Sequence, residues 1–350
     1  MRIFTPLHVF SAGAAIALLA GCSADSTTAP GLVHARGGTG SATDMRFRIP
    51  GPLGILKPGS PPVHHFNSFY SCPATGPIEY VSDYSNSVIN VYAGTFAGQA
   101  PCGQISDQVF WLNPAGLYVN PGNHDLYAAY TGSISVVAYR RGQIHPYSVY
   151  TDRTSQYPLD VALTHDGAVV ATNAFEVFGY PYGSISTWMR GSAGPKFIGN
   201  YPMTTSSYGG FVTVLKNDTI YFHDLDANSG LGLLYAVRCP FGRCGAQTLI
   251  AGVSFFDPLG LAHDATGDVL TVESVTRVTA DTFELPNPNP STFPLTGFPY
   301  AMAISARNHH WFIADGVNNI ASEYAYPGGA LIGSVPGNTG GDFDGIAVDP

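Results

Sequence analysis

The stretch that decides the fold is "GGDFDGIAVDP", Gly340–Pro350, which closes the 350-residue chain. It holds a short apolar strand, Gly345–Val348, with two carboxylates just ahead of it. Similar short strands occur five times earlier, and each of those leads through a polar turn into a second strand. The closing segment is therefore expected to be the first strand of a unit whose other strands lie elsewhere in the chain.

The units repeat along the chain as strand, polar turn and strand, and an aromatic residue closes the second of these strands in nearly every copy. The copies are Ile78–Gly94, His124–Tyr139, Gly167–Gly191, Asp218–Arg238, Gly267–Asp281 and His309–Tyr326. The strands that precede five of them are Ala115–Pro121, Leu159–Gly167, Gly210–Asp218, Leu259–Gly267 and Ala301–His309. Only the copy at Ile78 lacks such a predecessor, and the closing segment supplies it.

Equivalent positions in these units are 42 to 52 residues apart. Repeats of roughly 40–50 residues with four short strands are typical of β-propeller blades. The sequence therefore predicts an all-β, six-bladed β-propeller of four-stranded blades. Pairing of the C-terminal strand with the N-terminal strands closes the ring and leaves no open sheet edge. A β-sandwich or a β-helix with coincidental spacing is the alternative.

The composition agrees with short strands joined by tight turns. Only 11% of residues are charged, while 41 Gly, 27 Pro, 20 Tyr and 20 Phe supply turn and strand formers. The formal net charge of −9 excludes a nucleic-acid-binding surface, because phosphates require a basic face.

The N-terminal residues predict export and a lipid anchor. The apolar stretch "VFSAGAAIALLAGC" is too short for an ordinary spanning helix, and Leu19-Ala20-Gly21-Cys22 resembles the bacterial lipobox. That resemblance implies that residues 1–21 are a signal peptide and that the Cys22 thiol carries the lipid, a palmitate-type acyl anchor. Ser23 favours the outer membrane, with the folded body in the periplasm or at the surface. An ordinary signal peptide with an incidental cysteine is the alternative.

Residues 22–62 are predicted to be a flexible Gly/Pro-rich tether, and residues 63–350 the propeller domain. The remaining cysteines, Cys72, Cys102, Cys239 and Cys244, are even in number, as expected for disulfides in an oxidising compartment. The close spacing of Cys239 and Cys244 favours their pairing, which leaves Cys72 for Cys102. A zinc site is the alternative for the close pair.

The segments "YVSDYSNSVINVY" and "DGIAVDP" resemble NHL and YVTN-type propellers, a superfamily that includes gluconolactonase-like and streptogramin-lyase-like proteins. The resemblance covers roughly residues 78–350 and implies binding at the mouth of the central channel. Lactonase-like relatives hold a metal through Glu, Asn and Asp, and lyase relatives use histidine and glutamate. The candidates for the latter role are His165, His223, His263 and Glu273.

Polar residues recur at two places in each repeat. One is the end of the second strand, and the other is the loop through which the chain enters the innermost strand. The candidates for the channel mouth are Asp83, Asp160, Asn173, Asp224, Glu273, Asp315, Asp342 and Asp344, with Tyr130, Tyr208 and Tyr300 at related positions. Such oxygen atoms suit a calcium-like divalent cation, but Asp and Asn at a strand end also cap turns through backbone hydrogen bonds. The stretch "DLDANSG", Asp224–Gly230, departs from a calcium loop and is interpreted as a long turn.

The sequence favours a binding or interaction module for a small ligand, a glycan or an envelope protein over an enzyme. A metal-dependent, lactonase-like hydrolase or lyase at the channel mouth is the alternative. We expect a monomeric body, the membrane as a partner through the lipid anchor, and no cofactor apart from the divalent cation just considered.

Overall fold

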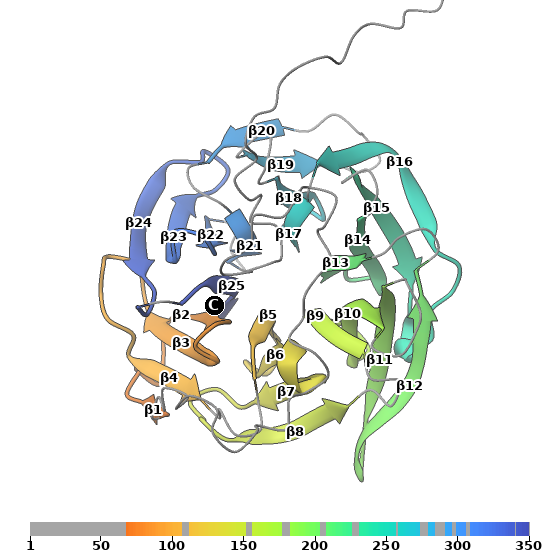
Figure 1. The fold of residues 1–350 in the computed structure, drawn as a ribbon, viewed down its shortest axis with the longest axis horizontal. Helices are drawn as coiled ribbons and strands as arrows, with labels where there is room; N and C mark the ends of the chain where they lie inside the picture. The colour runs from red at the N-terminus through yellow and green to blue at the C-terminus, as the bar shows by residue number, and fades with distance from the viewer. Residues whose placement is uncertain are drawn as a thin grey trace, which may run out of the picture.

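The computed structural model describes residues 68–106, 112–151, 156–176, 183–203, 208–225, 231–256, 258–273, 279–283, 291–295, 299–305, 309–339 and 341–349. Their strands form six antiparallel sheets. Figure 1 shows these sheets arranged radially around a central axis, with consecutive sheets adjacent. The predicted all-β class and the β-propeller arrangement are confirmed.

Three sheets hold the first half of the domain. The closing sheet, in the order β1-β4-β3-β2-β25, consists of β1 (Phe69–Tyr70), β2 (Ile78–Asp83), β3 (Val88–Ala93), β4 (Gly103–Ser106) and β25 (Phe343–Asp349). The next sheet consists of β5 (Pro114–Val119), β6 (Leu126–Tyr130), β7 (Ser135–Tyr139) and β8 (Pro146–Thr151). The third consists of β9 (Gln156–Leu163), β10 (Ala168–Glu176), β11 (Ser184–Gly191) and β12 (Gly194–Pro202).

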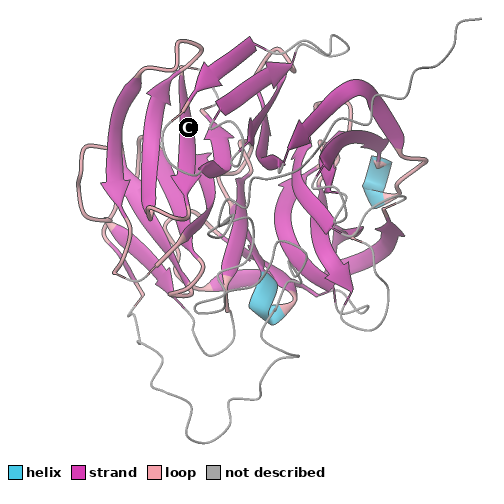
Figure 2. Cartoon of the chain, turned by 45° about the horizontal axis from the view of Figure 1, so that its top comes forward, coloured by secondary structure: helices cyan, strands magenta, loops and turns pink. Residues whose placement is uncertain are grey.

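The other three sheets follow in chain order. The fourth consists of β13 (Tyr208–Val214), β14 (Thr219–Leu225), β15 (Leu231–Arg238) and β16 (Thr248–Phe256). The fifth consists of β17 (Pro258–His263), β18 (Val269–Glu273), β19 (Thr279–Phe283) and β20 (Ser291–Pro294). The sixth consists of β21 (Pro299–Ile304), β22 (His310–Asp315), β23 (Ile320–Ala325) and β24 (Leu331–Pro336). Figure 2 shows the strands with the short 3-10 helices η2 (Thr131–Ser133) and η3 (Pro240–Gly242).

The innermost strands β5, β9, β13, β17, β21 and β25 form a closed ring, because each contacts the next and β25 contacts β5. Strand β25 pairs antiparallel with β2, from Ile78 opposite Asp349 to Asp83 opposite Phe343. The pairing of the C-terminal strand with the N-terminal strands is therefore as the sequence predicted.

The closing sheet differs from the prediction of four-stranded blades because it has a fifth strand. The two-residue strand β1 pairs with β4 at the outer edge. A disulfide between Cys72 and Cys102 joins the chain just after β1 to the start of β4. A two-residue strand has no periodicity from which to predict it, and the covalent link keeps it beside its partner.

Each innermost strand carries a bulge at the end where it begins. Three residue steps on that strand face two steps on its partner, which is the geometry of one inserted residue. The four-residue segments that contain the bulge are Pro114–Leu117, Pro158–Val161, Gly209–Val212, Pro258–Leu261, Pro299–Met302 and Phe343–Ile346. Four of the six start with proline, which lacks the N–H that a regular ladder would require.

The core lies between neighbouring sheets. Alternating Val, Ile, Leu and aromatic side chains of the inner strands are buried there, as strand periodicity requires. The aromatic residues that close the repeats, Tyr92, Tyr139, Trp188, Tyr235 and Tyr324, are all buried. Trp188, for example, packs edge-on against Tyr150 of the preceding sheet, with ring centroids 6.2 Å apart, and donates from Nε1 to the Thr151 carbonyl. Contacts of this kind hold adjacent sheets together.

The predicted signal peptide, Cys22 and tether lie outside the described residues. The second predicted disulfide, Cys239–Cys244, is present together with Cys72–Cys102. The two disulfides indicate an oxidising, extracytoplasmic environment. Within the described ranges we find no helix with the length and hydropathy to span a membrane.

Candidate functional site at the channel entry

The central channel is lined by the six innermost strands and is mostly apolar. We call the end where these strands begin the entry face and the end where they finish the exit face. The channel encloses a cavity of about 130 Å³, and its polar lining residues include Asp160, Thr213 and His263. Ligand pockets for drug-sized molecules are usually about 300–1,000 Å³. The channel itself therefore has room only for a small group, and a larger ligand would have to bind on a face.

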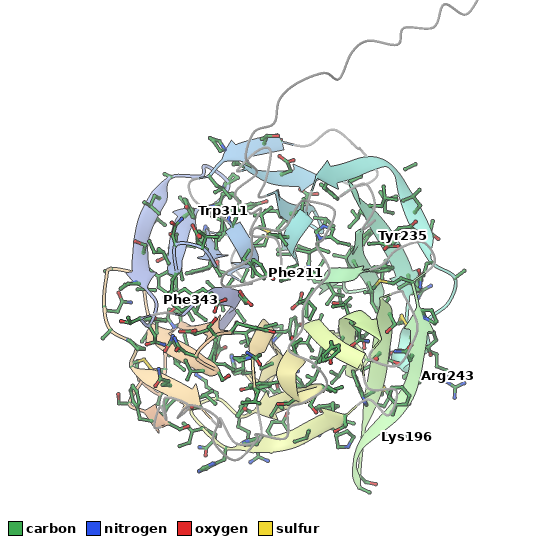
Figure 3. All side chains as sticks on the ribbon, in the orientation of Figure 1. Lys196, Phe211, Tyr235, Arg243, Trp311 and Phe343 are labelled. Atoms are coloured by element: carbon green, nitrogen blue, oxygen red, sulfur yellow. A yellow bond between two sulfur atoms is a disulfide. The ribbon has the colours of Figure 1, made fainter. Side chains whose placement is uncertain are left out.

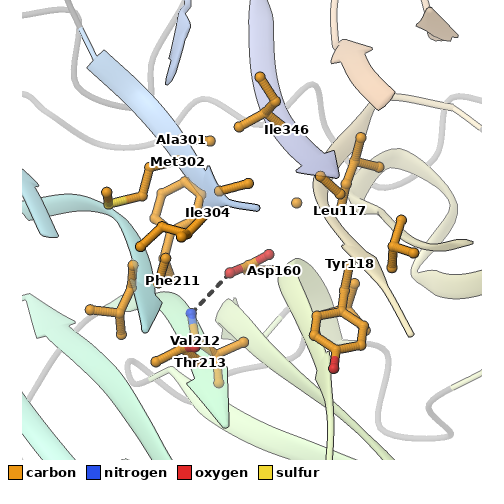
Figure 4. A pocket seen from close by; sticks show the side chains of 18 of the residues that line it. Leu117, Tyr118, Asp160, Phe211, Val212, Thr213, Ala301, Met302, Ile304 and Ile346 are labelled. Carbon is orange, nitrogen blue, oxygen red and sulfur yellow. Dashed lines mark hydrogen bonds between the residues drawn. The ribbon is translucent and has the colours of Figure 1, made fainter. Parts of the chain in front are cut away.

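Asp160 is the carboxylate of the channel (Figure 4). Its Oδ2 accepts a hydrogen bond of 2.9 Å from the backbone N–H of Val212, so it bridges β9 to β13. Burial raises the pKa of Asp160 to about 7, while the Val212 N–H opposes that rise. The equivalent residue of the preceding strand is Gly116, where a Cβ would lie 2.0 Å from Asp160 Oδ1. Glycine is therefore required there for the carboxylate to fit.

Replacing Asp160 with Asn is expected to change how stability depends on pH. The folded pKa of about 7 lies above the ordinary aspartate pKa of about 3.9. The stability linked to this proton is therefore fully present below about pH 4 and is lost as pH rises through about 7. Asp160→Asn keeps an oxygen acceptor for Val212, so it should match the wild type at pH 4 and exceed it at pH 8, by on the order of 2–4 kcal/mol. Urea unfolding at both pH values measures this, and equal stability at pH 8 would contradict it.

Phe211 and Tyr300 meet across the entry end of the channel. Their ring centroids are 5.9 Å apart in an edge-to-face arrangement. Phe211 belongs to β13 and Tyr300 to β21, so the pair bypasses the intervening strand β17. The intervening position is Gly260, which has no side chain to separate the rings. Figure 3 shows Phe211 close to the centre of the ring of sheets.

Asp344 is a buried carboxyl group of the entry face with a strongly raised pKa. Burial raises the pKa of Asp344 well above its usual range, and the neighbouring Asp342 and Asp83 raise it further. Its Oδ1 has no hydrogen-bond partner among the described residues. A Cβ at Gly316 would lie 3.6 Å from both Asp344 Oδ1 and Tyr300 Cδ2, so these groups flank the β22–β23 turn. A cation near this carboxylate would favour its ionised form.

Two of the predicted channel-mouth residues have the capping role that the sequence left as the alternative. Asp83 accepts hydrogen bonds from the backbone N–H and Nδ2 of Asn86, at 3.1 and 2.9 Å. Asp315 accepts the same pair from Asn318, at 2.9 and 2.7 Å. Both carboxylates close the turn between the second and third strands.

The other predicted residues at these positions have varied environments. Asn173 donates to the hydroxyls of Ser184 and Ser186, and Asp342 accepts from the backbone N–H of Ser85 at 2.7 Å. Asp224 is buried near the end of β14. Glu273 ends β18, and its side chain lies outside the description. All of these residues lie at or near the entry ends of strands, and Asn173 and Asp342 make hydrogen bonds within the fold.

The histidines suggested by the lyase resemblance do not assemble. His223 is fully buried between sheets, where its Nε2 lies 3.1 Å from Thr271 Oγ1, and burial lowers its pKa to about 3. His263 and His165 lie at the exit end, where His263 Nδ1 is 2.7 Å from Thr213 Oγ1. In the described part of the chain, no group of three or more His, Cys, Asp or Glu side chains is placed to hold a metal ion.

Charge is divided unequally between the two faces. The described Lys and Arg residues all lie at the exit face. There the first and third strands of each sheet end and the fourth strand begins. These residues are Arg140, Arg141, Arg190, Lys196, Lys216, Arg238 and Arg243. Lys196 and Arg243 are labelled at the rim in Figure 3. The described aspartates at or near the ends of strands on the entry face are buried: Asp83, Asp160, Asp224, Asp315, Asp342 and Asp344. The described part of the entry face therefore has carboxyl groups just beneath its surface and no Lys or Arg.

Sequence reasoning missed Phe211 and did not single out the contact that it makes with Tyr300. Both occupy the bulged four-residue segments, at positions that hold glycine, alanine or leucine in most other repeats. Aligning those segments by their proline and closing aliphatic residue would have shown Asp160, Phe211, Tyr300 and Asp344 as the exceptions. These four residues, which we call the mouth cluster, come from the innermost strands β9, β13, β21 and β25.

No family model matches the chain, and no curated protein matches it. Solved structures are similar in fold. The domain resembles a chain of a nidogen/laminin complex with a TM-score of 0.60, 12% identity, and coverage of 79% of this chain and 99% of that one. It also resembles a Bacteroides caccae protein of unknown function (TM-score 0.56, 9% identity, 78% and 99% coverage). A third similar structure is hydrazine synthase of Kuenenia stuttgartiensis (TM-score 0.51, 14% identity, 74% and 83% coverage). At these identities the likeness shows a shared β-propeller fold.

Proposed function

We propose that the protein is an exported, lipid-anchored, six-bladed β-propeller that works as a binding module. Its entry face engages a ligand or a partner segment that carries positive charge. The observation that carries the proposal is the division of charge: the described entry face holds carboxylates, and the described Lys and Arg residues lie at the exit face. A face of one sign attracts ligands of the other sign and raises their association rate.

The environment of Asp344 supports a cationic ligand. Three carboxylates, Asp83, Asp342 and Asp344, influence one another electrostatically, and the Oδ1 atom of Asp344 is buried without a described partner. A positive group would offset the mutual repulsion of these carboxylates. The small volume of the channel directs the ligand to the face, with at most one small group entering the channel beside the aromatic rings of the mouth cluster.

An oligolysine peptide is a suitable probe for this face. We expect saturable binding at low salt that weakens as salt is added, because dissolved ions screen the attraction between the lysines and the carboxylates. The double variant Asp342→Asn/Asp344→Asn should lower the affinity for the peptide about tenfold, which corresponds to the loss of one charged contact. A matched change at the exit face, Asp218→Asn, should leave it within about twofold. Equal losses in the two variants, measured by calorimetry, would refute binding at the entry face.

The lipid anchor at Cys22 is the second part of the proposal. It rests on the lipobox-like sequence and on disulfides that indicate an oxidising compartment. Cys22→Ser is expected to move the protein from the membrane fraction to the soluble periplasmic or secreted fraction. Membrane fractionation with immunodetection measures this, and unchanged membrane association would argue for an ordinary signal peptide.

A further inference from the structure

Two arginines from neighbouring sheets meet over one tyrosine ring near the rim of the exit face. Arg140 follows β7, and Arg190 lies in β11 of the next sheet. The Cζ atom of each lies 5.5 Å from the centroid of the Tyr147 ring, which belongs to β8. Both arginine side chains are exposed. The arrangement places two positive charges beside a single aromatic ring.

Hydrogen bonds of its hydroxyl hold Tyr147 in place. Its hydroxyl donates a hydrogen bond of 2.6 Å to Asp125 Oδ2, and the hydroxyl of Tyr127 lies 3.3 Å away. Asp125 Oδ2 also accepts from Asn123 Nδ2 at 2.8 Å. The carboxylate closest to the ring is therefore engaged with Tyr147 and Asn123, and the ring is a fixed platform for the arginines.

The charges of Arg140 and Arg190 are not neutralised by any carboxylate in the described ranges. The ion pairs there involve His124, Arg141 and His310. A cation–π contact at an exposed site is worth about 0.5–1 kcal/mol, and two positive charges beside one ring repel each other. An anion that both guanidinium groups reach would offset that repulsion.

A surface hollow adjoins Arg140 and the Tyr147 ring, which Arg190 contacts from the neighbouring sheet. It has a volume of about 510 Å³ and is lined by Arg140, Arg141, Gln143, His145 and Tyr147. Arg141 is already paired with the buried Asp349, whereas Gln143 and His145 are exposed. The hollow thus offers several hydrogen-bond donors around one opening and no described carboxylate in its lining.

We propose that this hollow is a binding site for a phosphate monoester or inorganic phosphate in its dianionic form. Two guanidinium groups match two negative charges, and each can donate paired N–H groups to phosphate oxygens. The Tyr147 ring sets the separation of the arginines, and Gln143 offers a neutral donor. The site is on the opposite face from the mouth cluster and does not depend on the function proposed for that cluster.

Titration calorimetry of the full chain carrying Cys22→Ser, with inorganic phosphate at constant ionic strength, tests the proposal. We expect saturable binding that Arg140→Gln and Arg190→Gln each weaken about tenfold or more, since each removes charge-assisted hydrogen bonds. Arg243→Gln removes an exposed arginine elsewhere on the same face and should leave binding unchanged. Circular dichroism establishes that each variant is folded.

Two further measurements distinguish binding at this site from non-specific attraction of anions to a positively charged surface. Dimethyl phosphate, a singly charged diester, should bind at least about tenfold more weakly than phosphate. Tyr147→Leu removes the ring between the arginines and should weaken phosphate binding, while Tyr147→Phe retains the ring and should not. Absence of saturable binding, an equal loss with Arg243→Gln, or equal affinity for the diester would overturn the proposal.

Discussion

Removal of Gly340–Pro350 is expected to unfold the whole domain. The deleted segment contains β25, which pairs with all of β2 and contacts β5 and β21. Phe343, Ile346 and Ala347 of this strand are buried. Burying a large apolar side chain contributes about 1.5–3 kcal/mol, and whole domains are stable by only about 5–15 kcal/mol. Far-ultraviolet circular dichroism with a thermal melt should show no cooperative transition.

A matched control separates the missing strand from the altered end of the chain. Residues 341–349 are moved in front of Ser68 through a flexible Gly/Ser linker, so that the same strand reaches β2 from the other end. This rearranged chain should regain a cooperative melt. A truncated chain that melts at the wild-type temperature would show that β25 does not close the ring.

Replacing Arg141 with Met is expected to destabilise the domain by about 3 kcal/mol or more. Arg141 Nη1 lies 2.7 Å from Asp349 Oδ2, and Arg141 Nη2 donates to the Gly76 carbonyl. Asp349 at the end of β25 is fully buried, and its other partner is His124 at 2.5 Å. Removing one partner of a buried ion pair typically costs about 3–5 kcal/mol, because the other charge stays buried. The melting temperature should fall by about 6–12 °C for a domain of this size.

The neighbouring arginine provides the control for that prediction. Arg140 is exposed and pairs with no carboxylate in the described ranges, so Arg140→Gln should cost only the cation–π contact with Tyr147, about 0.5–1 kcal/mol. A double variant, Arg141→Met with Asp349→Leu, removes both charges and should recover part of the loss. Equal stability of Arg141→Met and wild type would mean that Asp349 does not depend on this partner.

The repeat pattern was sufficient to predict the architecture because each unit supplies its own strand signals. The strand at Gly345–Val348 could be recognised from five earlier copies, and its pairing with the strand at Ile78 followed from the one copy without a first strand. The short strand β1 could not be predicted, since two residues carry no periodicity and a disulfide holds them in place.

The candidate site was predicted less well, for a physical reason. The entry ends of strands attract Asp and Asn both for capping and for binding, and composition alone does not separate these roles. Asp83 and Asp315 proved to cap turns. Asp160 and Asp344 differ because they lie in the bulged segments of innermost strands, not at the end of a second strand. The bulge depends on strand pairing, which becomes visible only in three dimensions.

Binding at the entry face is tested most directly by mapping where the oligolysine probe contacts the protein. Amide hydrogen exchange is measured with and without the peptide. We expect slower exchange in the entry-face turns at Ser85–Asn86 and Val317–Asn318, and unchanged exchange at the exit-face turn around Asp264–Asp268. Slower exchange confined to the exit face, or no change at either face under saturating peptide, would contradict it.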